Sequence, residues 1–570
     1  MNSERAFEVN LRRAVAAVID SYRHLGTSLR RYVLLALLPS ALFALGGVGA
    51  TVALSLPLSI GGPLSLLGTF TFVVAVAYPK VVEDRKRKQV RERFHLFLTH
   101  VTVLSMTNID RVEVFRTLAA EEEYRAIAEE MARIVALVDT WNQSLDDACR
   151  MRARRVPSDL LADFLERLAY TVGAGQELGD FLVAEQDSML QQFAIRYEGD
   201  LAKLDVLREL YLSLMLSVTF ILVFATVLPI IVGVEPTLLV GGVVGLLAVV
   251  QCGFLFVVHT VAPYDPVWYA SGIDRTPARR VRRTLVAGVA GTALAVAGAA
   301  AVRLGVTPVD PAGVPLAAYV AVPVTPLLLP GLAMRREENR VKERDEGFPP
   351  FVRALGSVES VKQTSTANVL RTLRRKDFGP LTENVDHLYR RLNTRIDTTR
   401  AWRLFAVETG SYLIQKFGDM YVIGRRMGGD PKRLGQVISR NMTEVLKLRE
   451  RRAQETATFV GVVYGITAAS VFSAFVGLEI AVLLTDIAKG FDADNPMMHT
   501  LFNPERYDVA TMELLLLFVV LLNALVSAVM IRIMDRGHTV NAYHHFVLLT
   551  WLGAGVAVVT GELIGSLITV

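Results

Sequence analysis

Long apolar runs alternate with long charged segments along this chain. Nine runs are close to the roughly 20 residues that a membrane-spanning helix needs. They cover residues 33–56, 58–79, 210–233, 238–262, 284–302, 315–334, 459–485, 512–531 and 546–569. The pattern therefore predicts a polytopic membrane protein with about nine transmembrane helices.

The two long charged segments, 80–209 and 335–458, have the periodicity of helices. In the first, apolar residues recur every three or four positions, as at Phe94, Phe97, Leu98, Val101 and Leu104. This spacing predicts amphipathic helices rather than alternating strands. Breaks are expected at 108–110, 156–159 and 173–175, with Ser158 or Asp159 capping the next helix. Each segment should hold four to six short antiparallel helices, and the fold class is all-α.

The two charged segments also look like copies of one another. Phe94 matches Phe348 at an offset of 254 residues. Arg116-Thr117-Leu118 matches 371–373 at an offset of 255, and Leu178-Gly179 matches 434–435 at an offset of 256. Three matches in the same order at a nearly constant offset predict a duplicated unit, a helical domain joined to membrane helices.

The distribution of basic residues predicts the orientation in the membrane. With the N-terminus inside, 58 of the 61 Lys and Arg residues fall on the inner side, and only Arg303, Lys489 and Arg506 fall outside. Cytoplasmic loops are enriched in Lys and Arg. Both helical domains are therefore expected in the cytoplasm and the C-terminus outside, in a multi-pass protein of the cell membrane.

These patterns divide the chain into six parts. They are a basic cytoplasmic N-terminal segment (1–32), transmembrane helices 1–2 (33–79), a first cytoplasmic domain (80–209), helices 3–6 (210–334), a second cytoplasmic domain (335–458) and helices 7–9 (459–570). Residues 9–25 have apolar positions at helical spacing. They form either an amphipathic helix on the inner membrane face or a tail that only sets topology.

The two domains differ in charge. Segment 80–209 carries a net charge of −5 and segment 335–458 a net charge of +10. Basic residues cluster in the second domain at Arg374, Arg375, Lys376, Arg425, Arg426, Lys432 and Arg433. Such clusters favour an acidic protein surface, although lipid headgroups or nucleic acid are other targets, and a solvated helix face is the plain alternative.

No pattern for catalysis, metal binding or cofactor binding is present. The sequence lacks a phosphate-binding G-x-x-x-x-G-K-[ST] loop, an H-E-x-x-H zinc motif and a G-x-S-x-G nucleophile elbow. Cys149 and Cys252 fall in a domain and a membrane run respectively, so they cannot form a disulfide framework. The chain is predicted not to be an enzyme.

A few polar residues lie inside the apolar runs. Glu479 and Glu562 are functional candidates because a carboxylate in hydrocarbon is costly. Both lie toward the outer ends of their runs, so snorkelling to the surface is the favoured interpretation. Gln251 and Asn523 are expected to join helices through hydrogen bonds. Gly241 and Gly245 have the four-residue spacing that permits close helix contact.

The duplicated layout resembles the type II secretion system F family, which comprises inner-membrane platform proteins of secretion systems, type IV pili and archaeal filaments. FLERLAYTVGAGQELGDFLVAEQDSM (164–189) resembles the end of that family's cytoplasmic domain. SMTNIDRVEVFRTLA (105–119) and LVDTWNQSLDDACR (137–150) look like platform proteins of the archaellum. The resemblance covers roughly residues 80–570.

The resemblance implies a platform without enzymatic activity of its own. Its expected partners are a hexameric secretion ATPase, pilin-like filament subunits (archaellins), a second copy in a homodimer and membrane lipid, with no nucleic acid. A platform of an archaeal adhesion pilus or secretion system is the alternative within the family. A transporter with two related halves is the alternative from another class, but it would be expected to carry midplane polar sites on broken helices.

Overall fold

The computed structural model describes residues 32–33, 37–42, 45 and 58–568, except 233–234, 264, 270–275, 307, 309, 311–312 and 491–507. Within these residues the chain is helical, with two isolated β-bridges and no β-strand. The all-α prediction is thus confirmed. The expected amphipathic helix at 9–25 and most of the 33–56 run lie outside the described residues.

Seven helices of the described part are long and apolar enough to cross a membrane. They contain the last seven of the nine predicted runs, and the 58–79 run lies within the long helix α4. The polytopic prediction is confirmed by these seven, while the total of nine stays a prediction.

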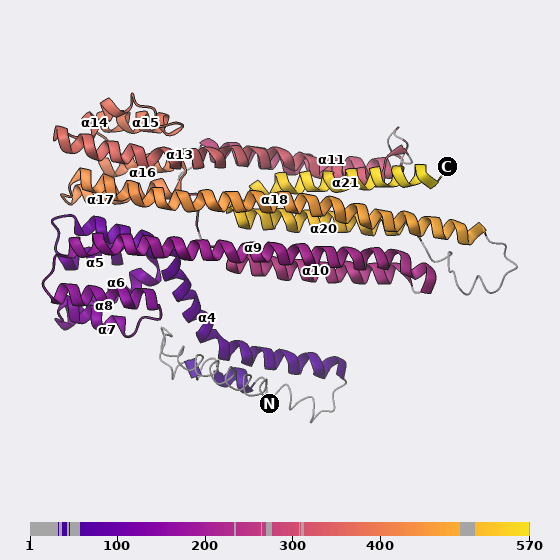
Figure 1. Cartoon of the computed structure of the whole chain (residues 1–570), viewed down its shortest axis with the longest axis horizontal. Helices are drawn as coiled ribbons and strands as arrows, with labels where there is room; N and C mark the ends of the chain where they lie inside the picture. Colours follow the sequence, from indigo (N-terminus) through magenta and orange to yellow (C-terminus); the bar gives the residue numbers. More distant parts are fainter. Residues whose placement is uncertain are drawn as a thin grey trace. The chain divides into compact units, whose positions relative to one another are not determined.

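The residues fall into two compact units, Met1–Leu190 with Ile423–Asp430, and Gln191–Val422 with Pro431–Val570. Figure 1 labels many of their helices. The first contains α4 (Leu58–Ser105), α5 (Arg111–Ala119), η3 (Glu122–Tyr124), α6 (Ala126–Trp141), α7 (Leu145–Ala153), α8 (Asp159–Gly173) and the start of α9 (Leu178–Val232). The second contains α10 (Pro236–Val261), α11 (Thr276–Arg303), α12 (Leu316–Val324), η5 (Thr325–Leu327), α13 (Leu328–Lys362), α14 (Thr366–Leu373), α15 (Leu381–Asn393), α16 (Thr398–Thr409), most of α17 (Tyr412–Arg426), α18 (Pro431–Gly490), α20 (Val509–Asp535), η7 (Thr539–Asn541) and α21 (Ala542–Ile568).

The expected helix breaks are present in the first unit. Asp110 is the N-cap of α5, and its carboxylate accepts a hydrogen bond from the backbone N–H of Val112. Gly175 follows α8 with φ of +76°, which glycine adopts without steric cost. Ser158 occupies the N-cap position of α8, but its side chain makes no capping hydrogen bond. The helix boundary there was predicted correctly, but the predicted capping hydrogen bond from Ser158 is absent.

The duplication is visible in helix order and in core packing. Each copy has a long helix, four short α-helices and a second long helix, α4 to α9 and α13 to α18. The ring of Phe97 packs edge-on against Tyr124 at 5.9 Å, and the ring of Phe351 packs edge-on against Phe378 at 5.4 Å. Both members of the second pair follow the first by 254 residues. Equivalent core aromatics therefore hold equivalent helices in the two copies.

Three helices run without interruption from a helical domain into an apolar stretch. The longest is α18, with 60 residues, or about 90 Å at 1.5 Å per residue. Near its start Leu434 is buried in the domain core, and farther along Phe459 and Val463 belong to the core of the spanning helices. Helices α9 and α13 likewise contain an apolar stretch and continue beyond it as charged helix.

The long helices α13 and α18 approach closely at a pair of glycines. A Cβ on Gly356 would lie 2.1 Å from the carbonyl oxygen of Pro431, and Gly435 lies against the backbone of Val352. Backbone atoms cannot give way as a flexible side chain can, so any larger residue must push the helices apart.

We expect Gly356→Ala to destabilise the protein by about 1–3 kcal/mol or more, because overpacking strains the helix pair. Gly461→Ala is the matched control on α18, since no atom lies within 4 Å of its added Cβ. That substitution should be neutral or stabilising by about 0.5–1 kcal/mol. Thermal unfolding of both variants in one detergent measures the difference, and equal melting temperatures would contradict the close approach.

Candidate functional site

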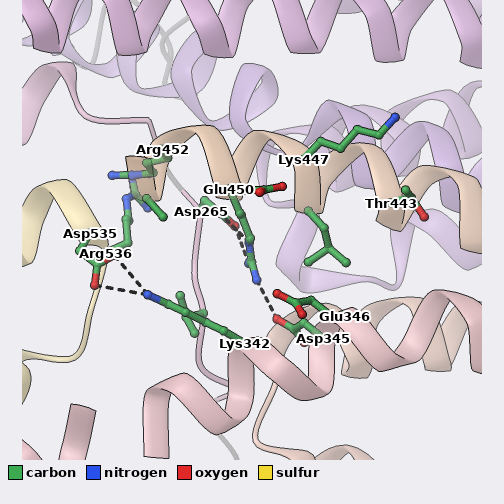
Figure 2. A pocket seen from close by; sticks show the side chains of 14 residues that line it. Asp265, Lys342, Asp345, Glu346, Thr443, Lys447, Glu450, Arg452, Asp535 and Arg536 are labelled. Carbon is green, nitrogen blue, oxygen red and sulfur yellow. Dashed lines mark hydrogen bonds and ion pairs between the residues drawn. The ribbon is translucent and has the colours of Figure 1, made fainter. Parts of the chain in front are cut away.

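A charged pocket of about 330 Å³ lies in the second unit, between α13, α18, the 262–268 connection and the end of α20 (Figure 2). Its charged and polar lining residues are Asp265, Lys342, Asp345, Glu346, Thr443, Lys447, Arg449, Glu450, Arg452, Asp535 and Arg536. Five lining residues are basic and five are acidic, so the pocket carries no net formal charge.

Arg449 links three segments at this pocket. Its Nε and Nη2 donate to the two carboxylate oxygens of Asp265 at 2.8 and 2.6 Å, and its Nη1 donates to Asp345 Oδ2 at 2.8 Å. Asp345 is fully buried and also accepts a hydrogen bond from the Ser411 hydroxyl. One guanidinium of α18 therefore holds the 262–268 connection and α13 together. Removing one partner of a buried ion pair typically costs several kcal/mol.

The two carboxylates respond differently to this environment. Burial would raise the pKa of Asp265, but the charge and hydrogen bonds of Arg449 outweigh it, and the pKa is lowered. At Asp345, in the charged half of α13 beyond its apolar stretch, burial outweighs the attraction of Arg449 and raises the pKa to about 6. Asp265 is thus the firm counter-ion, and Asp345 is the weaker acid of the pair.

Arg452, one turn farther along α18, binds carbonyl groups. Its Nε donates to Met534 O at 2.6 Å and its Nη2 to Ile533 O at 3.1 Å, both in the last turn of α20. Its Nη1 donates to Pro263 O at 3.0 Å. A cation at a helix C-terminus satisfies open carbonyls and matches the helix dipole. Lys342 of α13 adds an ion pair to Asp535 at 3.2 Å.

The pocket connects several chain segments. Most of its charged groups form ion pairs with one another or hydrogen bonds to backbone carbonyls. These interactions connect α13, α18, α20 and the 262–268 connection. Among the described residues no group of three His, Cys, Asp or Glu side chains could hold a metal ion. The arrangement can resist or transmit displacement of α18.

The predicted basic docking residues lie at three places. Arg374, Arg375 and Lys376 are exposed at the end of α14. Arg374 is partly used internally, because it pairs with Asp386 at 3.2 Å and lies over the ring of Tyr389. Arg375 and Lys376 are exposed and present their charge to solvent.

The remaining basic candidates flank the α17–α18 turn. Arg425 is half-buried and donates to Gly429 O at 2.7 Å, whereas Arg426 is exposed. Lys432 and Arg433 are exposed in the first turn of α18. Arg425 and Arg426 belong to the first unit and the other five to the second. Docking at these residues stays a prediction.

The polar residues inside the spans form a hydrogen-bonded cluster, as expected for Gln251 and Asn523. Gln251 Nε2 donates to Asn523 Oδ1 at 3.0 Å, and Tyr211 of α9 contacts Asn523 at 3.4 Å and Ser527 at 3.2 Å. All four side chains are buried. The prediction that Gln251 and Asn523 join helices is confirmed, and Tyr211 and Ser527 were missed.

The two intramembrane carboxylates have different surroundings. Glu562 is exposed on α21, and Glu479 of α18 is half-buried with its carboxylate beside Gly561. Glu479 also interacts electrostatically with Glu513 of α20, which sequence reasoning did not single out. Outward snorkelling of Glu479 and Glu562 stays a prediction.

Comparison with known proteins gives a family match and full-length relatives. Residues 97–226 match the model of the type II secretion system protein F. The chain is 31% identical over 562 residues to "Flagella accessory protein J" of Methanocaldococcus jannaschii, covering 98% of this chain and 99% of that protein. It is 31% identical to the protein of the same name in Methanococcus voltae, covering 97% and 99%. No solved structure matches significantly.

Lowering the pH from 7 to 5 should stabilise the wild type relative to Asp345→Asn. The pKa of Asp345 in the folded protein, about 6, lies above that of an unfolded Asp, about 3.9. Its stabilising contribution is therefore complete below the unfolded pKa and is lost as the pH rises through 6. Asp265, with a lowered pKa, loses its contribution only at more acidic pH.

Melting temperatures at pH 5, 6 and 7 test this expectation. Glu346→Gln is the matched control, because Glu346 is the exposed neighbour of Asp345 in the same pocket lining. Its profile should follow the wild type, whereas the Asp345→Asn profile should diverge with falling pH. Parallel profiles for all three proteins would contradict the role given to Asp345.

Proposed function

Because the chain belongs to the family of flagella accessory protein J, we propose that it is the membrane platform of an archaeal filament (archaellum) assembly machine. In this proposal it acts as a homodimer and couples a hexameric cytoplasmic secretion ATPase to the insertion of pilin-like subunits into the filament. The family match points to a structural membrane protein rather than an enzyme.

The observation that carries the coupling proposal is the continuity of the long helices. A helical domain joined to the membrane by a flexible loop could move without disturbing the spans. Here α18 passes from the second domain into the spanning bundle as one helix of 60 residues. A push on the domain would therefore shift the spanning part of the same helix.

The side chains that line the charged pocket would transmit a displacement of α18 to neighbouring helices. Arg449 connects α18 to α13 and to the 262–268 connection, and Arg452 connects it to the end of α20. Displacement of α18 would strain these bonds or carry the bonded segments along. We propose that the pocket transmits work from the ATPase side to α20 and its neighbours, where subunits leave the bilayer.

We also propose that both helical domains and the N-terminus face the cytoplasm and that the C-terminus lies outside. The support is the distribution of 58 of 61 basic residues on one side. In this orientation Arg374, Arg375 and Lys376 would face the cytoplasm, where a cytoplasmic partner could reach them.

Reporter fusions at three positions test the orientation. Fusions after Lys203 and after Arg449 should report a cytoplasmic location, and a fusion at Val570 should report an outside location. An outside signal at either of the first two positions would overturn the proposed topology and with it cytoplasmic docking.

For docking of the ATPase we expect Arg375→Glu with Lys376→Glu to lower its co-purification with the full-length protein about tenfold or more, since a like charge at an interface costs several kcal/mol. Arg400→Glu with Arg403→Glu is the control, because it reverses two exposed residues on α16 of the same domain. Both pairs change the net charge equally. Wild-type binding should weaken in high salt, because screening shortens the Debye length from about 10 Å at 0.1 M to about 3 Å at 1 M.

If both double variants bind as the wild type does, the dock lies elsewhere and the acidic first domain is the next candidate. If both lose binding equally, overall charge rather than the 375–376 site decides. Co-purification from native membranes also separates the wider alternatives. An archaellum platform should bring archaellins, an adhesion-pilus or secretion platform should bring other pilin-like subunits, and a two-repeat transporter should bring neither ATPase nor filament subunits.

A further inference from the structure

Four arginines gather at the start of α11. Arg279, Arg280, Arg282 and Arg283 are exposed, and the first turn of the helix contains no acidic residue. The positive end of the helix dipole lies at this N-terminus and disfavours cations there. The arginines therefore weaken the helix start rather than stabilise it, and an added anion at this position would stabilise it.

The rest of α11 is the least covered of the candidate spans. Within its most apolar stretch 6% of the residues are buried, against 28–56% in the other six spans. On one side Gly288 and Gly291 pack against Pro330 and Pro326. Away from that contact Val286, Val289 and Leu294 are 65%, 54% and 74% exposed. An apolar helix exposed to this degree is expected to face lipid, with its basic end at the headgroup level.

A fifth arginine lies at the same level on the neighbouring helix. The contacts Gly288–Pro330 and Gly291–Pro326 show that α11 and α13 run antiparallel. Arg282 lies six residues before Gly288, and the exposed Arg336 lies six residues after Pro330, so both are about 9 Å from the contact along their helices.

The acidic residues that follow Arg336 do not neutralise this group. Glu337 and Glu338 are buried. Glu337 pairs with Arg340 and Arg344, and Glu338 accepts a hydrogen bond from Asn541. The carboxylates thus serve internal contacts while the arginines remain at the surface.

We propose that Arg279, Arg280, Arg282, Arg283 and Arg336 form a binding site for the phosphate-bearing headgroup of an anionic membrane lipid. Guanidinium groups match phosphate through paired N–H donors. The lipid's chains would lie along the exposed face of α11 marked by Val286, Val289 and Leu294. Because this apolar face begins one turn from the arginines, it fits a lipid better than a soluble phosphate. Basic clusters beside a spanning helix attract anionic lipids in this way.

The test uses the full-length protein in nanodiscs of phosphatidylcholine containing phosphatidylglycerol. Retention of phosphatidylglycerol is measured by native mass spectrometry, and stability by thermal unfolding with and without the anionic lipid. Replacing the four α11 arginines by Gln should lower retained phosphatidylglycerol about tenfold and remove most of the stabilisation that it gives. The control replaces Arg375, Lys376, Arg400 and Arg403 by Gln, which removes the same charge from the helical domain and should leave both readouts unchanged.

Three outcomes would overturn the proposal. They are unchanged retention in the α11 variant, equal loss in the control, and equal stabilisation of the wild type by millimolar inorganic phosphate, which would indicate a soluble-anion site. If the fourfold variant fails to insert, Arg282→Gln with Arg283→Gln keeps Arg279 and Arg280 to set topology. That variant should retain about threefold less phosphatidylglycerol, and wild-type retention by it would also refute the site.

Discussion

A backbone inside a bilayer must satisfy its own hydrogen bonds, and this constraint governs the architecture. Helices meet it without partners, so each span is helical, and α9, α13 and α18 stay helical well beyond their apolar stretches. A helix that does not break between membrane and domain makes the two parts mechanically continuous. The proposed role in filament assembly rests on this continuity more than on any single side chain.

The copies share their cores and differ at the charged pocket. The edge-on pairs Phe97–Tyr124 and Phe351–Phe378 occupy equivalent positions, so duplication preserved the packing that holds each domain together. At the offset of 254 the position equivalent to Asp345 is occupied by Arg91. A buried bridge of the kind that Arg449 makes with Asp345 cannot form with an arginine there. The second copy thus has a buried ion pair that the first lacks at this position, consistent with unequal roles for the two domains.

The charged pocket could not have been found from the sequence. Asp345 and Arg449 are each one among many charged residues in the second domain, and Asp265 is a lone acidic residue in a short connection. What distinguishes them is burial and mutual distance, which depend on how three separate segments meet. The spacing of glycines in the sequence does not show where helices approach closely, for a related reason. Gly241 and Gly245 have the predicted spacing but meet no atom within 4 Å of an added Cβ, whereas the close approach occurs at Gly356.

The elements and their order could be predicted from the chain's local pattern, because hydrophobic length and period are local properties. Apolar runs of about 20 residues identify spans, a three-to-four-residue period identifies helices, and a constant offset identifies the repeat. Which charged residues became buried partners depended on how distant segments pack together. Arg449 and Arg374 are both arginines of the second domain, yet one is held between two carboxylates and the other lies exposed beside Asp386. Burial changes the energy of a charge by several kcal/mol, and burial is set by residues far away in the chain.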